Sequence, residues 1–162
     1  EIPGKDFLSR YKVSIDPVTT IDEQKIYKPL VCGSHPVYEN ARVNEFKTLL
    51  KSFKKQDDKQ GSLVRMGTLM MQSHESYSAV GLGNEYTDKI VEMVRDAGTN
   101  NGVYGARVSG GGNGGTVCIL SYGEEGKNSV KEIYARYKKE LKRKLFLFSG
   151  SSHGAYKLNQ YI

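Results

Sequence analysis

The chain has 162 residues, with 24 Lys and Arg against 18 Asp and Glu, and a formal net charge of +6 at pH 7. This length is enough for one domain with a real hydrophobic core and leaves little room for two. No apolar run approaches the roughly 18 residues of a membrane span, which argues against a transmembrane protein.

The N-terminal part of the chain is rich in residues that interrupt regular structure, namely Pro3, Gly4, Pro17 and Pro29. They predict an irregular or extended lead-in over residues 1–34, with a short strand at about 26–32. Residues 35–162 are expected to form a single domain. The chain begins at Glu1 without an initiator Met or an apolar signal-peptide core, so we expect it to be part of something longer.

Four helices are predicted from apolar residues that recur at three- and four-residue spacing. Their inward faces are expected to hold Val43, Phe46, Leu49, Leu50, Phe53, Leu63, Met66, Met70, Tyr77, Thr87, Ile90, Val91, Val94, Ala97, Val130, Ile133, Tyr134, Tyr137 and Leu141. Gly67 lies on the inward face of the second helix, where a neighbouring element is expected to approach closely. Asn84 is a good N-cap for the third helix, and Gly98 ends it. The fourth helix is expected at about residues 129–142.

Two β-rich runs, residues 104–109 and 116–122, are joined by a segment in which five of six residues are glycine. Two glycines are enough for a tight hairpin, so five indicate positive φ angles and a bare backbone whose amides are open to a close ligand. A bulged hairpin packed against a neighbouring element is the alternative. With further strands expected at 145–148 and 155–162, the fold class is α+β.

The spacing of Gly110, Gly112 and Gly115 also matches the fingerprint of dinucleotide-binding folds, but its context excludes that interpretation. The fingerprint requires a helix directly after the last glycine. The β-branched, apolar run at 116–120 predicts a strand instead. The same run contains Cys118, which we expect in the core. Cys32 has similar surroundings, and two such cysteines suggest a reduced, cytoplasmic compartment.

Residues 104–117 (YGARVSGGGNGGTV) closely resemble the third, glycine-rich motif of the GHMP small-molecule kinases. Upstream, residues 66–77 (MGTLMMQSHESY) resemble the leucine-rich helix of galactokinases. Three further stretches, at 16–19, 35–43 and 148–155, are similar to the C-terminal region of plant-type L-arabinokinases and their bacterial relatives. The resemblance covers nearly the whole chain, in the order found in the family.

This resemblance implies the C-terminal portion of an ATP-dependent sugar 1-kinase, folded as a ferredoxin-like α/β sandwich with an antiparallel sheet and added N-terminal helices. The full protein would transfer the γ-phosphate of ATP, with Mg²⁺, to the anomeric hydroxyl of a monosaccharide. The N-terminal half of the same protein would be the partner that holds most of the nucleotide and supplies the catalytic Asp. The family's first two motifs are absent here, so the chain alone is expected to be inactive and to contain no catalytic residue.

By the same resemblance, the positions beside the phosphate site are Ser109, Gly110, Gly111, Gly112, Asn113, Gly114 and Gly115. His74 and Arg107 are candidates for positions near the substrate. A lone helical His is also typical of a hydrogen-bonded packing residue, and an Arg that alternates with apolar neighbours is typical of a solvated sheet residue. The three histidines lack metal-ligand spacing, so no metal site is predicted.

Two other functions are compatible with parts of the sequence. One is a stand-alone binding or regulatory module that keeps this fold. The other is RNA binding, suggested by the basic run at 138–144 (KKELKRK). An RNA-binding sheet needs several stacking aromatics, and residues 116–122 offer only Tyr122. The basic residues suit the solvent side of an amphipathic helix, so neither a nucleic acid nor a membrane is an expected partner.

Overall fold

The computed structural model describes residues 1–150 except for residues 14, 16–19, 112–114 and 143. The elements in chain order are β1 (Ile2–Pro3), α1 (Gly4–Tyr11), β2 (Ile26–Tyr27), α2 (Pro29–Ser52), the 3₁₀ turn η1 (Phe53–Lys55), α3 (Lys59–Ala79), α4 (Glu85–Ala97), the 3₁₀ turn η2 (Thr99–Asn101), β3 (Val103–Ser109), β4 (Thr116–Ser121) and α5 (Gly123–Leu141). This mixture of helices with antiparallel strand pairs confirms the predicted α+β class and the added N-terminal helices.

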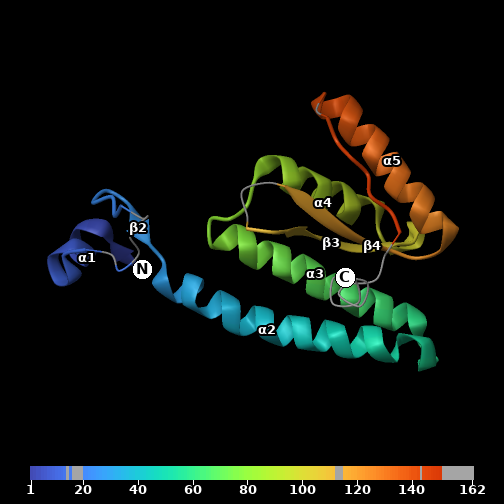
Figure 1. Cartoon of the computed structure of the whole chain (residues 1–162), viewed down its shortest axis with the longest axis horizontal. Coiled ribbons are helices and arrows are strands. Elements are labelled where there is room, and N and C mark those ends of the chain that lie inside the picture. The colour runs from blue at the N-terminus through green and yellow to red at the C-terminus, as the bar shows by residue number, and fades with distance from the viewer. Residues whose placement is uncertain (14, 16–19, 112–114, 143, 151–162) are drawn as a thin grey trace, which may run out of the picture.

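The β3–β4 hairpin lies at the centre of the main body, between α3 on one side and α4 on the other (Figure 1). The two strands are antiparallel, and Ser109 opposite Thr116 is their last pair before the glycine-rich connection. Helix α2 packs along α3 on the side away from the hairpin, whereas α5 contacts α4 and both strands. Strands β1 and β2 pair with each other and form a small unit with α1 at the N-terminal end of α2.

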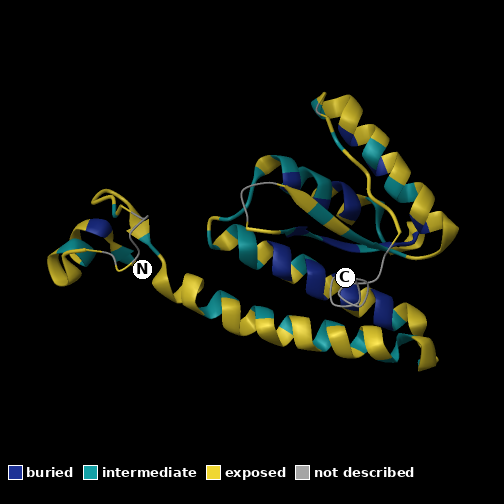
Figure 2. Cartoon of the chain, viewed as in Figure 1, coloured by how far each residue is buried: buried dark blue, intermediate teal, exposed yellow. Residues whose placement is uncertain are grey.

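The hydrophobic core is formed by α3, α4, β3 and α5, where the dark blue segments concentrate in Figure 2. The largest fully buried side chains are Met66, Met93, Val94, Val103 and Val108. The predicted inward faces of α3 and α4 are confirmed, because Leu63, Met70 and Val91 are also buried. Helix α2, by contrast, contains no buried residue. None of the helices in the described part of the chain is both long and apolar enough to cross a bilayer.

Glycine allows the backbones of α3 and β3 to touch. A Cβ atom built on Gly67 would overlap the carbonyl oxygen of Tyr104, and one built on Gly105 would overlap the backbone of Gly67. The close approach predicted for Gly67 is therefore confirmed. A second pair, Gly102 and Gly126, brings the start of β3 against the first turns of α5 in the same way.

The N-terminal segment is more regular than predicted. Residues 4–11 form α1 instead of an irregular lead-in, because Pro3 and Gly4 stand at the helix start, where they cost little, and Phe7 packs on Tyr11 one turn later. The expected strand at 26–32 is confined to β2. Helix α2 starts at Pro29, a favoured first-turn position, and continues through Pro36. The proposed division of the chain at residue 34 stays a prediction.

Two expectations for the C-terminal half were wrong in detail. Residues 145–148 do not form a strand, because no described strand pairs with them and Leu145 packs on the core beside α5. Residues 155–162 lie outside the described part.

Cys118 is exposed, since Val117 and Ile119 turn to the core and the alternation of a strand turns Cys118 to the other face. Cys32 is also exposed, and it lies in α2.

Candidate functional site

The glycine-rich loop closes the β3–β4 hairpin, as predicted. Gly110 has a φ of +93° and Gly115 a φ of +103°, conformations that L side chains rarely adopt. Ser109 is half-buried as the last residue of β3, and the three described loop glycines, Gly110, Gly111 and Gly115, are exposed. Gly112, Asn113 and Gly114 lie outside the described residues.

No closely packed neighbour requires glycine at the described positions of the loop. Apart from the immediate chain neighbours, no atom of the described residues lies within 4 Å of a Cβ built on Gly110, Gly111 or Gly115. The alternative of a bulged hairpin packed against another element stays a prediction. A side chain at these positions would meet open space, which is compatible with a loop that approaches a phosphate.

One side chain reaches the loop from α3. The hydroxyl of Tyr77 donates a hydrogen bond of 2.7 Å to the carbonyl oxygen of Gly110. The ring of His35, on α2, lies 5.4 Å from that of Tyr77, and Nδ1 of His35 is 2.7 Å from Oγ of Ser76. Sequence reasoning placed Tyr77 only on an apolar face. Its position one turn after His74, at the end of α3 that β3 runs toward, was the signal for this contact.

Arg107 is half-buried and paired, because it belongs to a cluster centred on Glu39. Its Nη1 donates to Oε1 of Glu39 over 2.7 Å, the same oxygen that accepts from Oγ of Ser73 over 2.6 Å. Nε of Arg42 donates to the other carboxylate oxygen over 2.9 Å. Burial alone would raise the pKa of Glu39, but the hydrogen bonds from Ser73 and Arg42 and the charges of Arg107 and Arg42 together hold it below 4.5. The cluster joins α2, α3 and β3.

His74 is buried and links β3 to α4. The backbone N–H of Val108 donates to Nδ1 of His74 over 3.4 Å, and Nε2 lies 3.3 Å from Oδ1 of Asp88. An acceptor role for Nδ1 assigns the proton to Nε2, on the side of the ring that faces the carboxylate of Asp88. Among the described residues, however, Oδ1 of Asp88 has no hydrogen-bond partner, so this contact is electrostatic. Burial lowers the pKa of His74 below 6.5, although the charge of Asp88 raises it. These contacts fit a packing residue, and a position near substrate stays a prediction.

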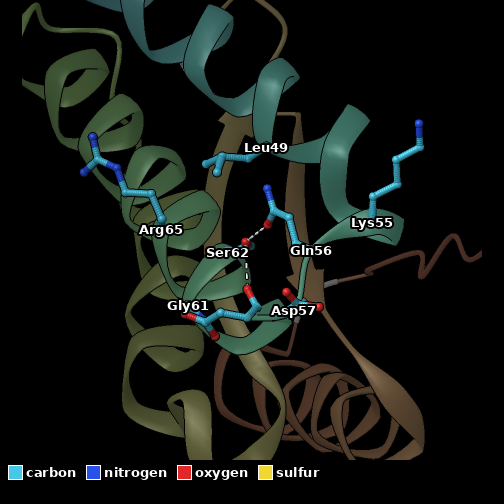
Figure 3. Close-up of a pocket in the computed structure, with 8 residues that line it drawn as sticks. Leu49, Lys55, Gln56, Asp57, Gly61, Ser62 and Arg65 are labelled. Atoms are coloured by element: carbon cyan, nitrogen blue, oxygen red, sulfur yellow. Dashed lines mark hydrogen bonds between the residues drawn. The ribbon is translucent and has the colours of Figure 1, made fainter.

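Two hollows lie away from the glycine loop. One, of about 530 Å³, is at the turn from α2 to α3, where Ser62 bonds to Gln56 (Figure 3). The side chain of Asp58 already accepts from the N–H of Gly61 there, so that helix start is capped. The other, of about 290 Å³, is mainly apolar and has Glu39, Arg42 and Arg107 on its lining. In the described residues, no group of three or more His, Cys, Asp or Glu is placed to hold a metal ion.

Comparison with known proteins identifies the family to which this fold and loop belong. The model of the GHMP kinases C-terminal family matches residues 49–143, which run from α2 through α5 and include the whole hairpin. The chain therefore belongs to the GHMP kinase family and contains its C-terminal domain.

The relatives point to one branch of that family. The chain is 40% identical to the L-arabinokinase of Arabidopsis thaliana over 94% of its length, which is 15% of that protein. It is 38% identical to the galactokinase of Thermotoga petrophila over 67% of its length, or 28% of that enzyme. The galactokinase of Candida albicans is 27% identical over 81% of the chain and 24% of its own length. The chain thus spans less than a third of the length of these relatives and is similar to their sugar-kinase branch.

Proposed function

We propose that this chain is the C-terminal part of an ATP-dependent sugar kinase, which transfers the γ-phosphate of ATP to the anomeric hydroxyl of a monosaccharide. The observation that carries the proposal is the open space beside Gly110, Gly111 and Gly115, in a hairpin of the GHMP kinase C-terminal domain. The identity to an L-arabinokinase and to galactokinases supports a sugar as the acceptor.

Phosphoryl transfer depends on positioning and on stabilising the charge of the transferring group. In this proposal the loop amides supply part of that field beside the phosphates, and Ser109 lies at its edge. Mg²⁺, when bound, neutralises charge on the phosphates. By the family resemblance, the N-terminal half of the protein would supply both the ligands of Mg²⁺ and the catalytic Asp. The chain alone is then inactive.

The test joins this chain to its native upstream sequence and measures ADP release with galactose, arabinose and related sugars. We expect turnover with at least one sugar for the joined protein and none for the 162-residue chain. Absence of turnover with every sugar would contradict the kinase proposal and favour a stand-alone binding or regulatory module.

A matched pair of glycine variants in the joined protein tests the role of the loop. Gly111 and Gly33 both have open space around a built Cβ, so alanine fits at either position. Gly111→Ala is expected to reduce turnover because its methyl group occupies the space proposed for the phosphate. Gly33→Ala, on α2, should leave turnover unchanged. Equal activity of both variants would contradict the proposal that the loop lies at the phosphate site.

A further inference from the structure

The contact between Tyr77 and Gly110 holds the loop just beyond the last strand pair. Ser109 is still paired with Thr116 in the ladder, whereas Gly110 follows it with a φ of +93°. The 2.7 Å hydrogen bond from Tyr77 is thus a tether from α3 to the first residue of the loop. It engages the carbonyl of Gly110 and not the N–H of Gly111.

That carbonyl belongs to the same peptide group as the N–H of Gly111. The peptide is planar and trans, so the N–H points in the direction opposite to the carbonyl, away from Tyr77. Glycine on both sides leaves this peptide free to rotate, because neither residue has a side chain to restrict its dihedral angles. A hydrogen bond that holds the carbonyl therefore also sets the direction of the N–H.

We infer that Tyr77 is a positioning residue that fixes the Gly110–Gly111 peptide and thereby aims the N–H of Gly111 at the phosphate oxygens of the bound nucleotide. The inference rests on the proposed function. An N–H held in place beforehand loses no orientational freedom when the anion binds, and it stabilises the developing charge at no reorganisation cost.

Tyr77 is itself held from a third element. The ring of His35 lies against it at 5.4 Å, and Nδ1 of His35 contacts Oγ of the adjacent Ser76 at 2.7 Å. Both contacts come from α2 and meet the half-buried end of α3. The hydroxyl therefore reaches Gly110 from a ring that α2 and α3 position together.

The chain contains a matched control for this hydroxyl. Tyr104, on β3, donates to Oε1 of Gln60, in the first turn of α3, over 2.8 Å. Tyr77→Phe and Tyr104→Phe each remove one hydroxyl that bridges α3 and the β3 strand region, at opposite ends of the same pair of elements. A purely structural effect of losing such a bridge appears in both variants, whereas an effect on the loop appears only in Tyr77→Phe.

The first measurement uses the 162-residue chain and the NMR order parameter of the Gly111 N–H vector. We expect about 0.8 or more in the unmodified chain and in Tyr104→Phe, and below about 0.6 in Tyr77→Phe. Equal values in all three proteins would overturn the inference. This readout needs no enzymatic activity, so it decides the inference about the peptide even where the kinase proposal fails.

The second measurement uses the joined protein. Loss of one hydrogen bond that orients an anion contact is expected to lower kcat/KM for MgATP about three- to tenfold in Tyr77→Phe, with KM for the sugar unchanged. Tyr104→Phe should match the unmodified protein. An equal fall in both variants, or a fall confined to KM for the sugar, would overturn the assignment of Tyr77 to the nucleotide phosphates.

Discussion

At the crossing of α3 and β3, glycine is required because two backbones touch, whereas in the loop after β3 it stands in open space. A side chain at Gly67 or Gly105 would overlap neighbouring backbone atoms. Gly110 and Gly111, by contrast, have no described neighbour within 4 Å of a built Cβ, apart from the adjacent residues of the chain. The two regions are joined by the same strand. Glycine thus serves packing in the first region, whereas in the second we propose that it gives a ligand access to the backbone. The two uses predict different consequences of substitution.

The largest effect is expected at the packed crossing. Gly67→Ala forces the α3 and β3 backbones apart and should lower the free energy of unfolding by about 3 kcal/mol or more. Gly33→Ala is the matched control, since Gly33 is also helical but has open space around it. It should raise stability by up to about 1 kcal/mol through helix propensity. Urea unfolding of the two variants measures both values, and similar midpoints would contradict the comparison.

The Glu39 cluster, which joins the packed crossing to α2, is expected to give the next largest effect. Glu39→Gln removes the carboxylate that Arg42 and Arg107 share and leaves two half-buried guanidinium groups without their counter-charge. We expect a loss of about 2 kcal/mol in the free energy of unfolding.

The control for Glu39→Gln is Glu45→Gln. This variant breaks the exposed ion pair between Glu45 on α2 and Arg65 on α3, and it should change the urea midpoint very little. A comparable loss in both variants would show that burial does not decide the strength of these pairs.

The pH dependence of stability tests the link between α3 and β3 at His74. Burial lowers the pKa of His74 below 6.5, so the unfolded chain binds a proton at a higher pH than the folded chain. Stability from this residue is complete above pH 6.5 and is lost as the pH falls toward the folded pKa, by at most about 1.4 kcal/mol per pH unit. Urea unfolding at pH 7.5 and 5.5 measures the loss, and His74→Gln should remove this part of it.

The smallest stability effects are expected in the open loop. Gly110→Ala places a side chain at a φ of +93° and should cost about 1 kcal/mol through backbone strain alone. Gly111→Ala, for which no positive φ occurs and no neighbour is near, should change stability by less than about 0.5 kcal/mol. Calorimetry distinguishes these values from that of Gly67→Ala. A large loss at Gly111 would mean that the loop is packed after all.

Several elements that depend on local sequence patterns were predicted correctly. Apolar residues at helical spacing located α3 and α4, and Asn84 marked the start of α4, where its side chain accepts from the N–H of Tyr86. The β-branched run at 116–120 identified a strand, because such residues favour an extended backbone. The glycine-rich segment and the motif around it identified the family, because such a dense motif can be recognised without any knowledge of contacts.

Contacts between residues far apart in the sequence show which glycines are packed, which charges are paired and which side chain contacts the loop. Glu39 meets Arg107 across 68 positions of sequence, and Tyr77 meets Gly110 across 33. Cys118 shares the apolar character of its neighbours, yet its face of the strand is the exposed one. Local preferences set backbone conformation, but a contact between distant residues depends on how helices and strands stack. The direction of the Gly110–Gly111 peptide group depends on that stacking.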